Sequence, residues 1–219
     1  MLAPLELKDA SAQYNGTAVL RGVSIKIEPG EKVSLIGKSG AGKTTLLKLL
    51  YAQRPSESAL VPQDLGLVGS LSVFHNIYMG RLDSNSTWHN LLNLVRPMRA
   101  AIDGVRQVAA NVGLGELLFE RVGEISGGQQ QRTAIGRALY RASPIFFGDE
   151  PVSSVDERQS RDVLDAIVGE HGTVVLSMHD VDLALAYSDR LIGLESGRVV
   201  LDAPVGGVSR SDIDRLYRG

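Results

Sequence analysis

The sequence predicts an α/β domain with a mostly parallel sheet, a small antiparallel β edge and an inserted helical lobe. Short apolar runs at 32–37, 144–150 and 172–180 are typical of buried strands in a parallel sheet. Helical patterns separate these runs, and strands that alternate with helices favour parallel pairing. From about residue 71 to residue 123 the pattern is helical and loop-rich. We therefore expect one domain over residues 1–219 that carries a helical subdomain at about 71–123.

The individual elements follow from local periodicity. Residues 5–14 and 22–37 alternate polar and apolar side chains and predict strands, with a turn at 28–30. Residues 43–53 predict a helix, and 58–63 predict a short strand. A second helix is expected over 127–142, whose apolar residues form one stripe, and a hairpin over 189–202. In such sheets ligands bind at the carboxyl ends of the strands.

The composition excludes several classes of function. Lys and Arg total 23 against 25 Asp and Glu, and aromatic residues are 5%, so nothing favours a nucleic-acid partner. The chain has no cysteine, which excludes disulfides, thiolate catalysis and cysteine-bound zinc. No apolar run approaches the roughly 20 residues that cross a bilayer, and residues 1–10 do not resemble a signal peptide. We therefore expect membrane association to come through a partner.

Residues 37–44, "GKSGAGKT", match the phosphate-binding pattern G-x-x-x-x-G-K-[ST] between a predicted buried strand and a helix. Backbone N–H groups of such a loop converge on phosphate oxygens at the positive end of the helix. Lys43 is expected to reach the β- and γ-phosphates, Thr44 to bind Mg²⁺, and Thr45 to lie near the α-phosphate. The motif predicts a P-loop NTPase core that binds ATP and Mg²⁺ through Gly37, Lys38, Ser39, Gly40, Ala41, Gly42, Lys43, Thr44 and Thr45.

Polar residues follow two of the predicted buried strands. Asp149 and Glu150 come directly after the run 145–148, where a Mg²⁺ ion beside a phosphate loop needs an oxygen ligand. We expect Asp149 to bind the metal and Glu150 to polarise the attacking water. His179 ends the next strand and is expected either to contact the γ-phosphate or to serve as a structural hydrogen-bonding group. The alternative for the acidic pair is two solvated loop carboxylates, which the phosphate loop disfavours.

Read in order, the phosphate loop, Gln63, "SGGQQ" (126–130), residues 145–150, "SSVD" (153–156) and His179 resemble the ATP-binding subunits of ABC transporters. The resemblance covers nearly the whole chain. Its most specific part is "ISGGQ", which matches the family signature L-S-G-G-Q with Ile125 in place of leucine. Ser126 is a good N-cap residue, and the following glycines would expose N–H groups at a helix start, which is an anion site.

The resemblance implies that two nucleotide-binding domains dimerise head to tail, with each ATP between one phosphate loop and the partner's signature turn. It implies that Ser126, Gly127, Gly128 and Gln129 serve the γ-phosphate of the partner's ATP. It also implies that Tyr14 stacks on adenine, and that Gln63 touches Mg²⁺ and the attacking water and relays nucleotide state to a membrane subunit. Residues 153–156 would cross the dimer interface.

The function so implied is an ATPase that powers transmembrane transport from the cytoplasmic face of the inner membrane, as a peripheral dimer bound to an integral membrane permease. Residues 71–88 and 177–204 look most like the ATPases of phosphonate or phosphite importers, which would add an external substrate-binding protein as a partner. Other importers, exporters, a soluble non-transport ABC ATPase and a binding-only subunit remain alternatives. The family's additional β segment has no counterpart in residues 46–62, so the antiparallel edge is expected to be unusually small.

Overall fold

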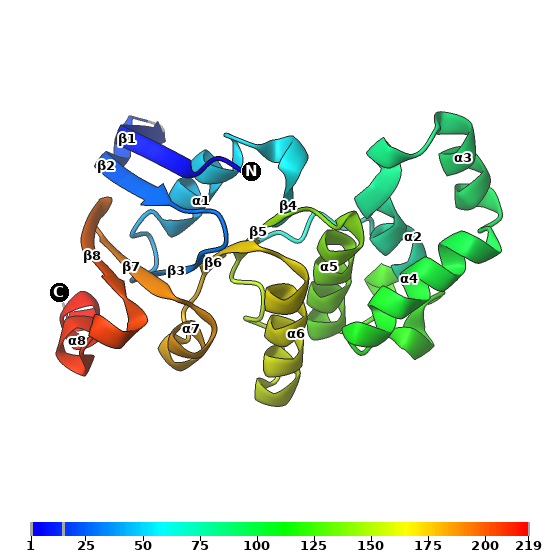
Figure 1. Ribbon diagram of the computed structural model, residues 1–219. Helices are drawn as coiled ribbons and strands as arrows, with labels where there is room; N and C mark the ends of the chain where they lie inside the picture. The colour runs from blue at the N-terminus through cyan, green and yellow to red at the C-terminus, as the bar shows by residue number, and fades with distance from the viewer. Residues whose placement is uncertain (1, 15, 219) are drawn as a thin grey trace. The chain divides into compact units, whose positions relative to one another are not determined.

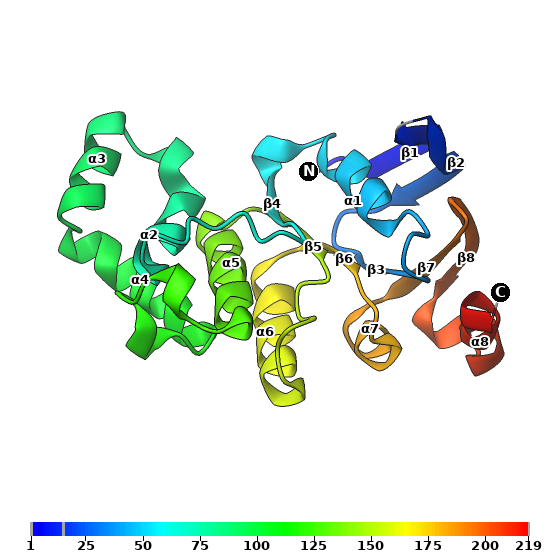
Figure 2. The ribbon, with the colours of Figure 1, turned by 180° about the vertical axis from the view of Figure 1, so that it is seen from behind.

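The computed structural model describes residues 2–14 and 16–218, which form two compact units. The sheet unit consists of the chain up to residue 60, residues 144–150, and the chain from residue 171 onward. The helical unit consists of residues 61–143 and 151–170. Figures 1 and 2 show the elements of both units from opposite sides.

The sheet unit begins with the antiparallel pair β1 (Leu5–Tyr14) and β2 (Thr17–Ile27), which form a two-stranded sheet. The small antiparallel edge predicted from the sequence is thus confirmed. Alternate side chains of these strands point into the core, because successive residues of a strand face opposite sides. Leu5, Leu20 and Val23 are among those that are fully buried there.

The main sheet has six strands in the order β4-β5-β6-β3-β7-β8. Strand β3 pairs parallel with both β6 and β7, and β5 pairs parallel with β6, whereas β7 and β8 form an antiparallel hairpin. The mostly parallel sheet predicted from the apolar runs is therefore confirmed. The bounds are Lys32–Ile36 for β3, Ser58–Val61 for β4, Ile145–Asp149 for β5, Thr173–Ser177 for β6, Arg190–Glu195 for β7 and Arg198–Pro204 for β8.

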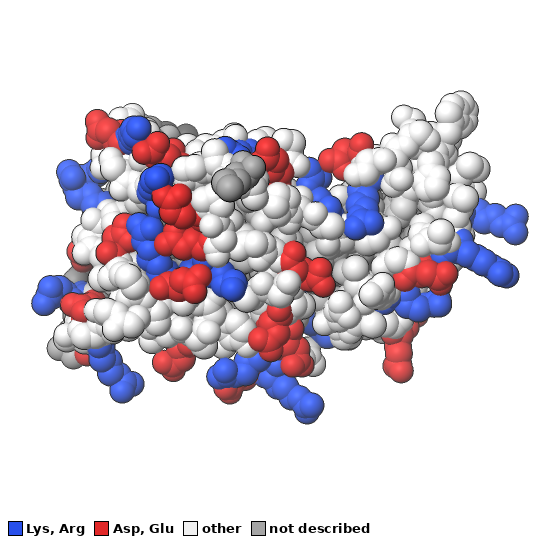
Figure 3. All heavy atoms as spheres, in the orientation of Figure 1, with Lys and Arg blue, Asp and Glu red and all other residues white. Residues whose placement is uncertain are grey.

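Helices cover both faces of this sheet in the sheet unit. Helix α1 (Lys43–Tyr51) buries Leu46, Leu47 and Leu50 against the strands on the side of β1 and β2. Helices α7 (Val181–Tyr187) and α8 (Arg210–Arg218) lie on the other side (Figures 1 and 2). Short 3₁₀ turns occur at Pro55–Glu57 and Val205–Gly207. Acidic and basic side chains are interspersed over the β1, β2 and β8 region in Figure 3, as the balanced composition predicts.

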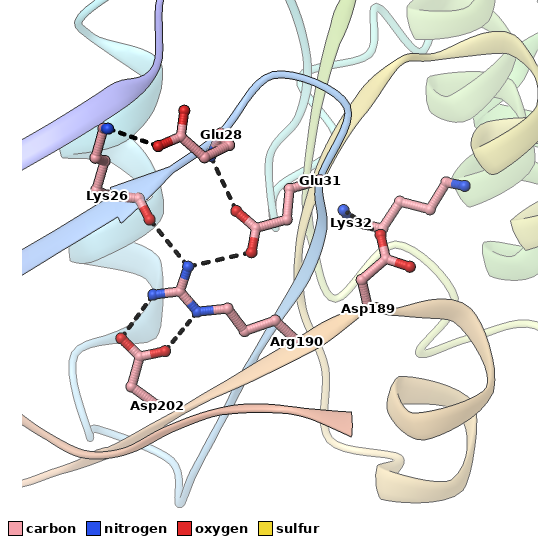
Figure 4. Close-up of polar contacts among 7 residues, drawn as sticks. All are labelled: Lys26, Glu28, Glu31, Lys32, Asp189, Arg190 and Asp202. Atoms are coloured by element: carbon pink, nitrogen blue, oxygen red, sulfur yellow. Dashed lines mark hydrogen bonds and ion pairs between the residues drawn. The ribbon is translucent and has the colours of Figure 1, made fainter. Parts of the chain in front are cut away.

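One polar network joins strands β2, β7 and β8 of the sheet unit to Glu31, which directly precedes β3 (Figure 4). The Arg190 guanidinium donates two hydrogen bonds to the Asp202 carboxylate, at 2.5 and 2.7 Å, and one to Glu31 Oε1 at 3.1 Å. It also donates to the Lys26 carbonyl at 3.0 Å. The hydrogen bonds to Asp202, more than any other cause, raise the pKa of Arg190. The network lies where β3 and β7 begin, at the end of the parallel strands opposite their carboxyl ends.

The helical unit contains five α-helices among its described residues. Their bounds are Val73–Tyr78 for α2, Thr87–Val95 for α3, Arg99–Asn111 for α4, Gly127–Arg141 for α5 and Glu157–Glu170 for α6, with 3₁₀ turns at Met79–Ser84, Gly115–Leu117 and Val122–Glu124. Helix α5 packs against α2, α4 and α6. Across the residues that the structure describes, no helix is both long enough and apolar enough to cross a membrane.

Candidate active site

The phosphate loop leaves the carboxyl end of β3 and enters α1, as the motif predicts. Gly42 occupies the N-cap position of α1 with φ +106°. A Cβ there would lie 2.8 Å from Leu20 Cδ2 and 3.0 Å from the Val19 carbonyl oxygen, so only glycine fits. No described side chain caps this helix, and its first N–H groups are therefore available to an anion.

Lys43 is buried in the first turn of α1 and reaches back over the loop. Its ammonium donates to the carbonyl oxygens of Gly37 at 2.7 Å and Lys38 at 3.1 Å. Burial lowers the pKa of Lys43, whereas the charges of Glu150 and Asp149 raise it. The two carboxylates thus offset part of the desolvation of the ammonium. The ammonium would neutralise phosphate oxygens bound in the loop.

Asp149 ends β5 directly opposite Ser177, which ends β6. Asp149 is 3% exposed, and its Oδ1 is buried without a hydrogen-bond partner among the described residues; the Ser177 hydroxyl is in the same situation. A buried, unpaired carboxylate oxygen is costly, and binding a cation removes that cost. The donor set therefore fits Mg²⁺, which Asp149 and the Thr44 hydroxyl would hold.

Glu150 follows β5 in a left-handed backbone conformation, with φ +54°. Such conformations are unfavourable for residues other than glycine and are concentrated at functional sites. The Glu150 N–H donates to the Ser177 carbonyl at 3.0 Å, which fixes the turn. His179 Nε2 lies 2.6 Å from Glu150 Oε1, so the imidazole orients this carboxylate. Two of the predicted catalytic residues, Glu150 and His179, are therefore in direct contact.

The predicted signature turn opens α5 in the helical unit. The Ser126 hydroxyl accepts a hydrogen bond from the Gln129 N–H at 3.3 Å, and Gln129 Oε1 accepts one from the Ser126 N–H at 2.8 Å. This reciprocal capping box confirms Ser126 as the N-cap residue. The following Gly127 and Gly128 lie in the first turn of the helix, where their N–H groups lack intrahelical partners. Their role toward a phosphate stays a prediction.

Gln131 is a residue of this region that the sequence reasoning missed. It is 3% exposed, its Oε1 accepts from the Ser154 N–H at 2.7 Å, and its Nε2 donates to the Ser153 hydroxyl at 3.2 Å. A Cβ on Gly128 would lie 2.7 Å from the Ser154 carbonyl oxygen. The signature helix and residues 153–156 are thus in direct contact. The run of three glutamines in "GGQQQR" is the sequence signal that could have indicated it.

Arg137 also has a specific contact, which no motif of the sequence indicates. Its guanidinium donates to the carbonyl oxygens of Leu65 and Gly66, both at 2.6 Å. Burial lowers the pKa of Arg137. Arg137 therefore holds the chain just after Gln63, whose side chain is exposed beyond the end of β4. The role of Gln63 in binding Mg²⁺ and water stays a prediction.

Tyr217 of α8 contacts the phosphate loop from a segment without any motif. Its hydroxyl accepts a hydrogen bond from the Gly37 N–H at 3.3 Å, and burial raises the pKa of Tyr217. The neighbouring Leu216 is buried beside Gly193 of β7, which anchors the helix. Tyr14, at the end of β1, is 76% exposed, so its ring is accessible for stacking, and its adenine contact stays a prediction.

The chain is similar to known proteins in both sequence and structure. The family model described as "ABC transporter" matches residues 20–153. A Pseudomonas syringae pv. tomato protein named phosphonates import ATP-binding protein PhnC 1 is 39% identical, over 93% of this chain and 87% of its own length. The dimeric structure of a bacterial ABC transporter cassette has a TM-score of 0.81 at 22% identity, over 93% of this chain and 99% of the other. A dimeric post-hydrolysis cassette bound to ADP and Pi has a TM-score of 0.76 at 23% identity, over 93% and 99% of the two chains.

Proposed function

The chain belongs to the ABC transporter family of ATP-binding cassettes, and from that membership we propose that it is the ATPase subunit of an importer of phosphonates, phosphite or a related anion. It hydrolyses ATP to ADP and phosphate and thereby powers transport across a membrane. The observation that carries the ATPase part of this proposal is the contact of Glu150 with His179, together with the buried Lys43 and Asp149.

The chemistry is a transfer of the γ-phosphoryl group to water, in which the protein mainly supplies position and charge. Glu150 accepts a proton from the attacking water, and His179 keeps the carboxylate turned toward that water. Lys43 neutralises charge on the β- and γ-phosphates. Asp149 and Thr44 would hold Mg²⁺, which would further neutralise charge on the phosphate oxygens.

We propose that the signature turn acts on the nucleotide of a second subunit. Ser126, Gly127, Gly128 and Gln129 present N–H and side-chain groups of one subunit to the γ-phosphate held by the other, and ATP closes the dimer. Gln131 supports this role because it ties residues 153–156 to the same helix. Gln63, on a loop held by Arg137, would report the nucleotide state to the permease.

The cargo and the partners are proposed from the relatives. Several of them, including the Pseudomonas protein, are named as phosphonate import ATPases. By analogy, the partners of this chain are an integral membrane permease, a second ATPase subunit and an external substrate-binding protein. The chain would then sit at the cytoplasmic face of the membrane, bound to its permease.

Two substitutions test the ATPase assignment in the complex with the permease. Lys43→Ala should abolish tight ATP binding, whereas Glu150→Gln should bind ATP and lose turnover. Normal hydrolysis by Glu150→Gln would overturn the role of Glu150 as base. The cargo is tested separately in vesicles, where methylphosphonate with the substrate-binding protein should stimulate ATPase activity, and stimulation only by an unrelated solute would contradict the anion assignment.

A further inference from the structure

The apolar residues of helix α3 face solvent and not the interior of the helical unit. Trp88, Leu91, Leu92 and Val95 are spaced i, i+3, i+4 and i+7, which places them on one face. In a globular protein this stripe normally packs inward. Here all four side chains are exposed, with Trp88 at 77% and Val95 at 80%. We call these four residues the α3 face.

The opposite, polar side of α3 is fixed against the helical unit. Asn93 is fully buried, and its Oδ1 accepts a hydrogen bond from the Met98 N–H at 2.9 Å. Asn90 Oδ1 accepts from the Tyr78 hydroxyl at 3.0 Å. Turning the α3 face inward would break these bonds and leave buried polar groups unpaired, which is costly. The helix is therefore held with its apolar stripe outward.

The charged residues next to α3 in the chain are basic. Between Asp83 and Asp103 the only Lys, Arg, Asp or Glu residues are Arg96 and Arg99. Asp83 is paired with Arg141 at 3.0 Å. Figure 3 shows the surface over α3 as uncharged, with basic side chains at its margin. A partner for this surface must therefore combine an apolar layer with negative charge.

We propose that the α3 face is a lipid-contact surface that lies in the interface of an anionic membrane leaflet. Tryptophan and leucine on one face are typical of helices that lie in this interface. The basic residues that such helices also carry are supplied here by Arg96, which follows α3, and Arg99, which begins α4. The indole and aliphatic side chains enter the boundary between headgroups and acyl chains, and Arg96 and Arg99 pair with anionic headgroups. This contact is additional to attachment through a permease, which was the only membrane association expected from the sequence.

Charge complementarity favours lipid over a loop of the permease. Cytoplasmic loops of membrane proteins are enriched in Lys and Arg, which would repel Arg96 and Arg99. Anionic headgroups attract both residues. Because α3 has only 9 residues, one such helix gives weak and reversible binding, suited to orienting a subunit that a protein partner also holds.

Trp88 is the only tryptophan of the chain and so reports directly on this contact. The purified full-length protein is titrated with vesicles of phosphatidylglycerol and phosphatidylethanolamine, or of phosphatidylcholine alone. With the anionic vesicles we expect a blue shift of Trp88 emission, quenching by brominated acyl chains, and weakening of both at high salt. No shift with the anionic vesicles would overturn the proposal.

Vesicle sedimentation with paired variants provides a readout that does not depend on fluorescence. Leu92→Asp should lower binding to anionic vesicles about tenfold or more, because it places a charge in the apolar face. The matched control, Val200→Asp, alters an exposed valine of β8 and should bind like the parent. Equal loss in both variants would contradict the proposal. A blue shift of Trp88 emission that appears only when the detergent-solubilised permease is added would also contradict it. So would a shift that increases with protein concentration in the absence of vesicles, because it would report contact with a second copy of the chain.

Discussion

The two neighbouring glycines of the signature turn, Gly127 and Gly128, should respond differently in thermal stability when each is replaced by alanine. A Cβ on Gly128 would lie 2.7 Å from the Ser154 carbonyl oxygen, whereas a Cβ on Gly127 would meet nothing within 4 Å. Both residues lie in the first turn of α5, so Gly→Ala changes their helix propensity by a similar amount. The difference between the two variants therefore isolates the steric contact.

The size of that difference follows from the contact. A backbone carbonyl cannot rotate away like a flexible side chain, so Gly128→Ala must displace residues 153–156 or the start of α5. Overpacking of this kind costs about 1–3 kcal/mol. For a chain of this size each kcal/mol shifts Tm by about 2–4 °C. Gly128→Ala is therefore expected to melt about 2–12 °C below Gly127→Ala.

The assay is thermal denaturation of the two purified variants and the parent, followed by ATPase activity in the complex with the permease. Gly127→Ala should melt at or slightly above the parent temperature. Gly128→Ala should melt lower and lose activity, because residues 153–156 are tied to the same helix through Gln131. Equal melting temperatures for the two variants would refute the reasoning that Gly128 is required by close approach to Ser154.

Three further substitutions test contacts described above. Tyr217→Phe removes the acceptor for the Gly37 N–H but keeps the ring, and should raise the KM for ATP about two- to tenfold in steady-state kinetics. An unchanged KM would contradict this role. Arg137→Met removes the hydrogen bonds to the carbonyl oxygens of Leu65 and Gly66. It should speed amide hydrogen exchange of residues 64–68 and lower the free energy of unfolding by about 1–3 kcal/mol. Unchanged exchange would show that this segment does not need the contact. Arg190→Met leaves the carboxylates of Glu31 and Asp202 without their shared cation. It should lower the free energy of unfolding in denaturant by about 1–3 kcal/mol, and by less at high salt. A loss of stability that does not respond to salt would argue against an electrostatic cause.

The features of the site that could be predicted from the sequence are those formed by residues that are consecutive in the chain. The phosphate loop, the acidic pair and the signature cap are each contiguous, so motif and local periodicity were sufficient to locate them. The parallel sheet followed from the apolar runs, because strands buried on both faces need continuous hydrophobic residues.

The parts that were missed depend on residues far apart in the chain. Tyr217 meets Gly37, and Arg137 meets Leu65 and Gly66, only after strands and helices have packed. The outward face of α3 was also unpredictable, because its spacing is that of an ordinary buried stripe. The buried side chain of Asn93 and the hydrogen bond from the Tyr78 hydroxyl to Asn90 keep the polar side of the helix inward, and periodicity carries no information about either.

In the proposed cycle ATP joins two copies of this chain, and the signature turn of one copy completes the nucleotide site of the other. Light scattering on purified Glu150→Gln, with and without ATP, tests it most directly, because this variant should retain ATP without hydrolysing it. We expect a change from monomer to dimer when ATP is added. A protein that binds ATP and remains a monomer would contradict the claim that the signature turn closes over a partner's nucleotide.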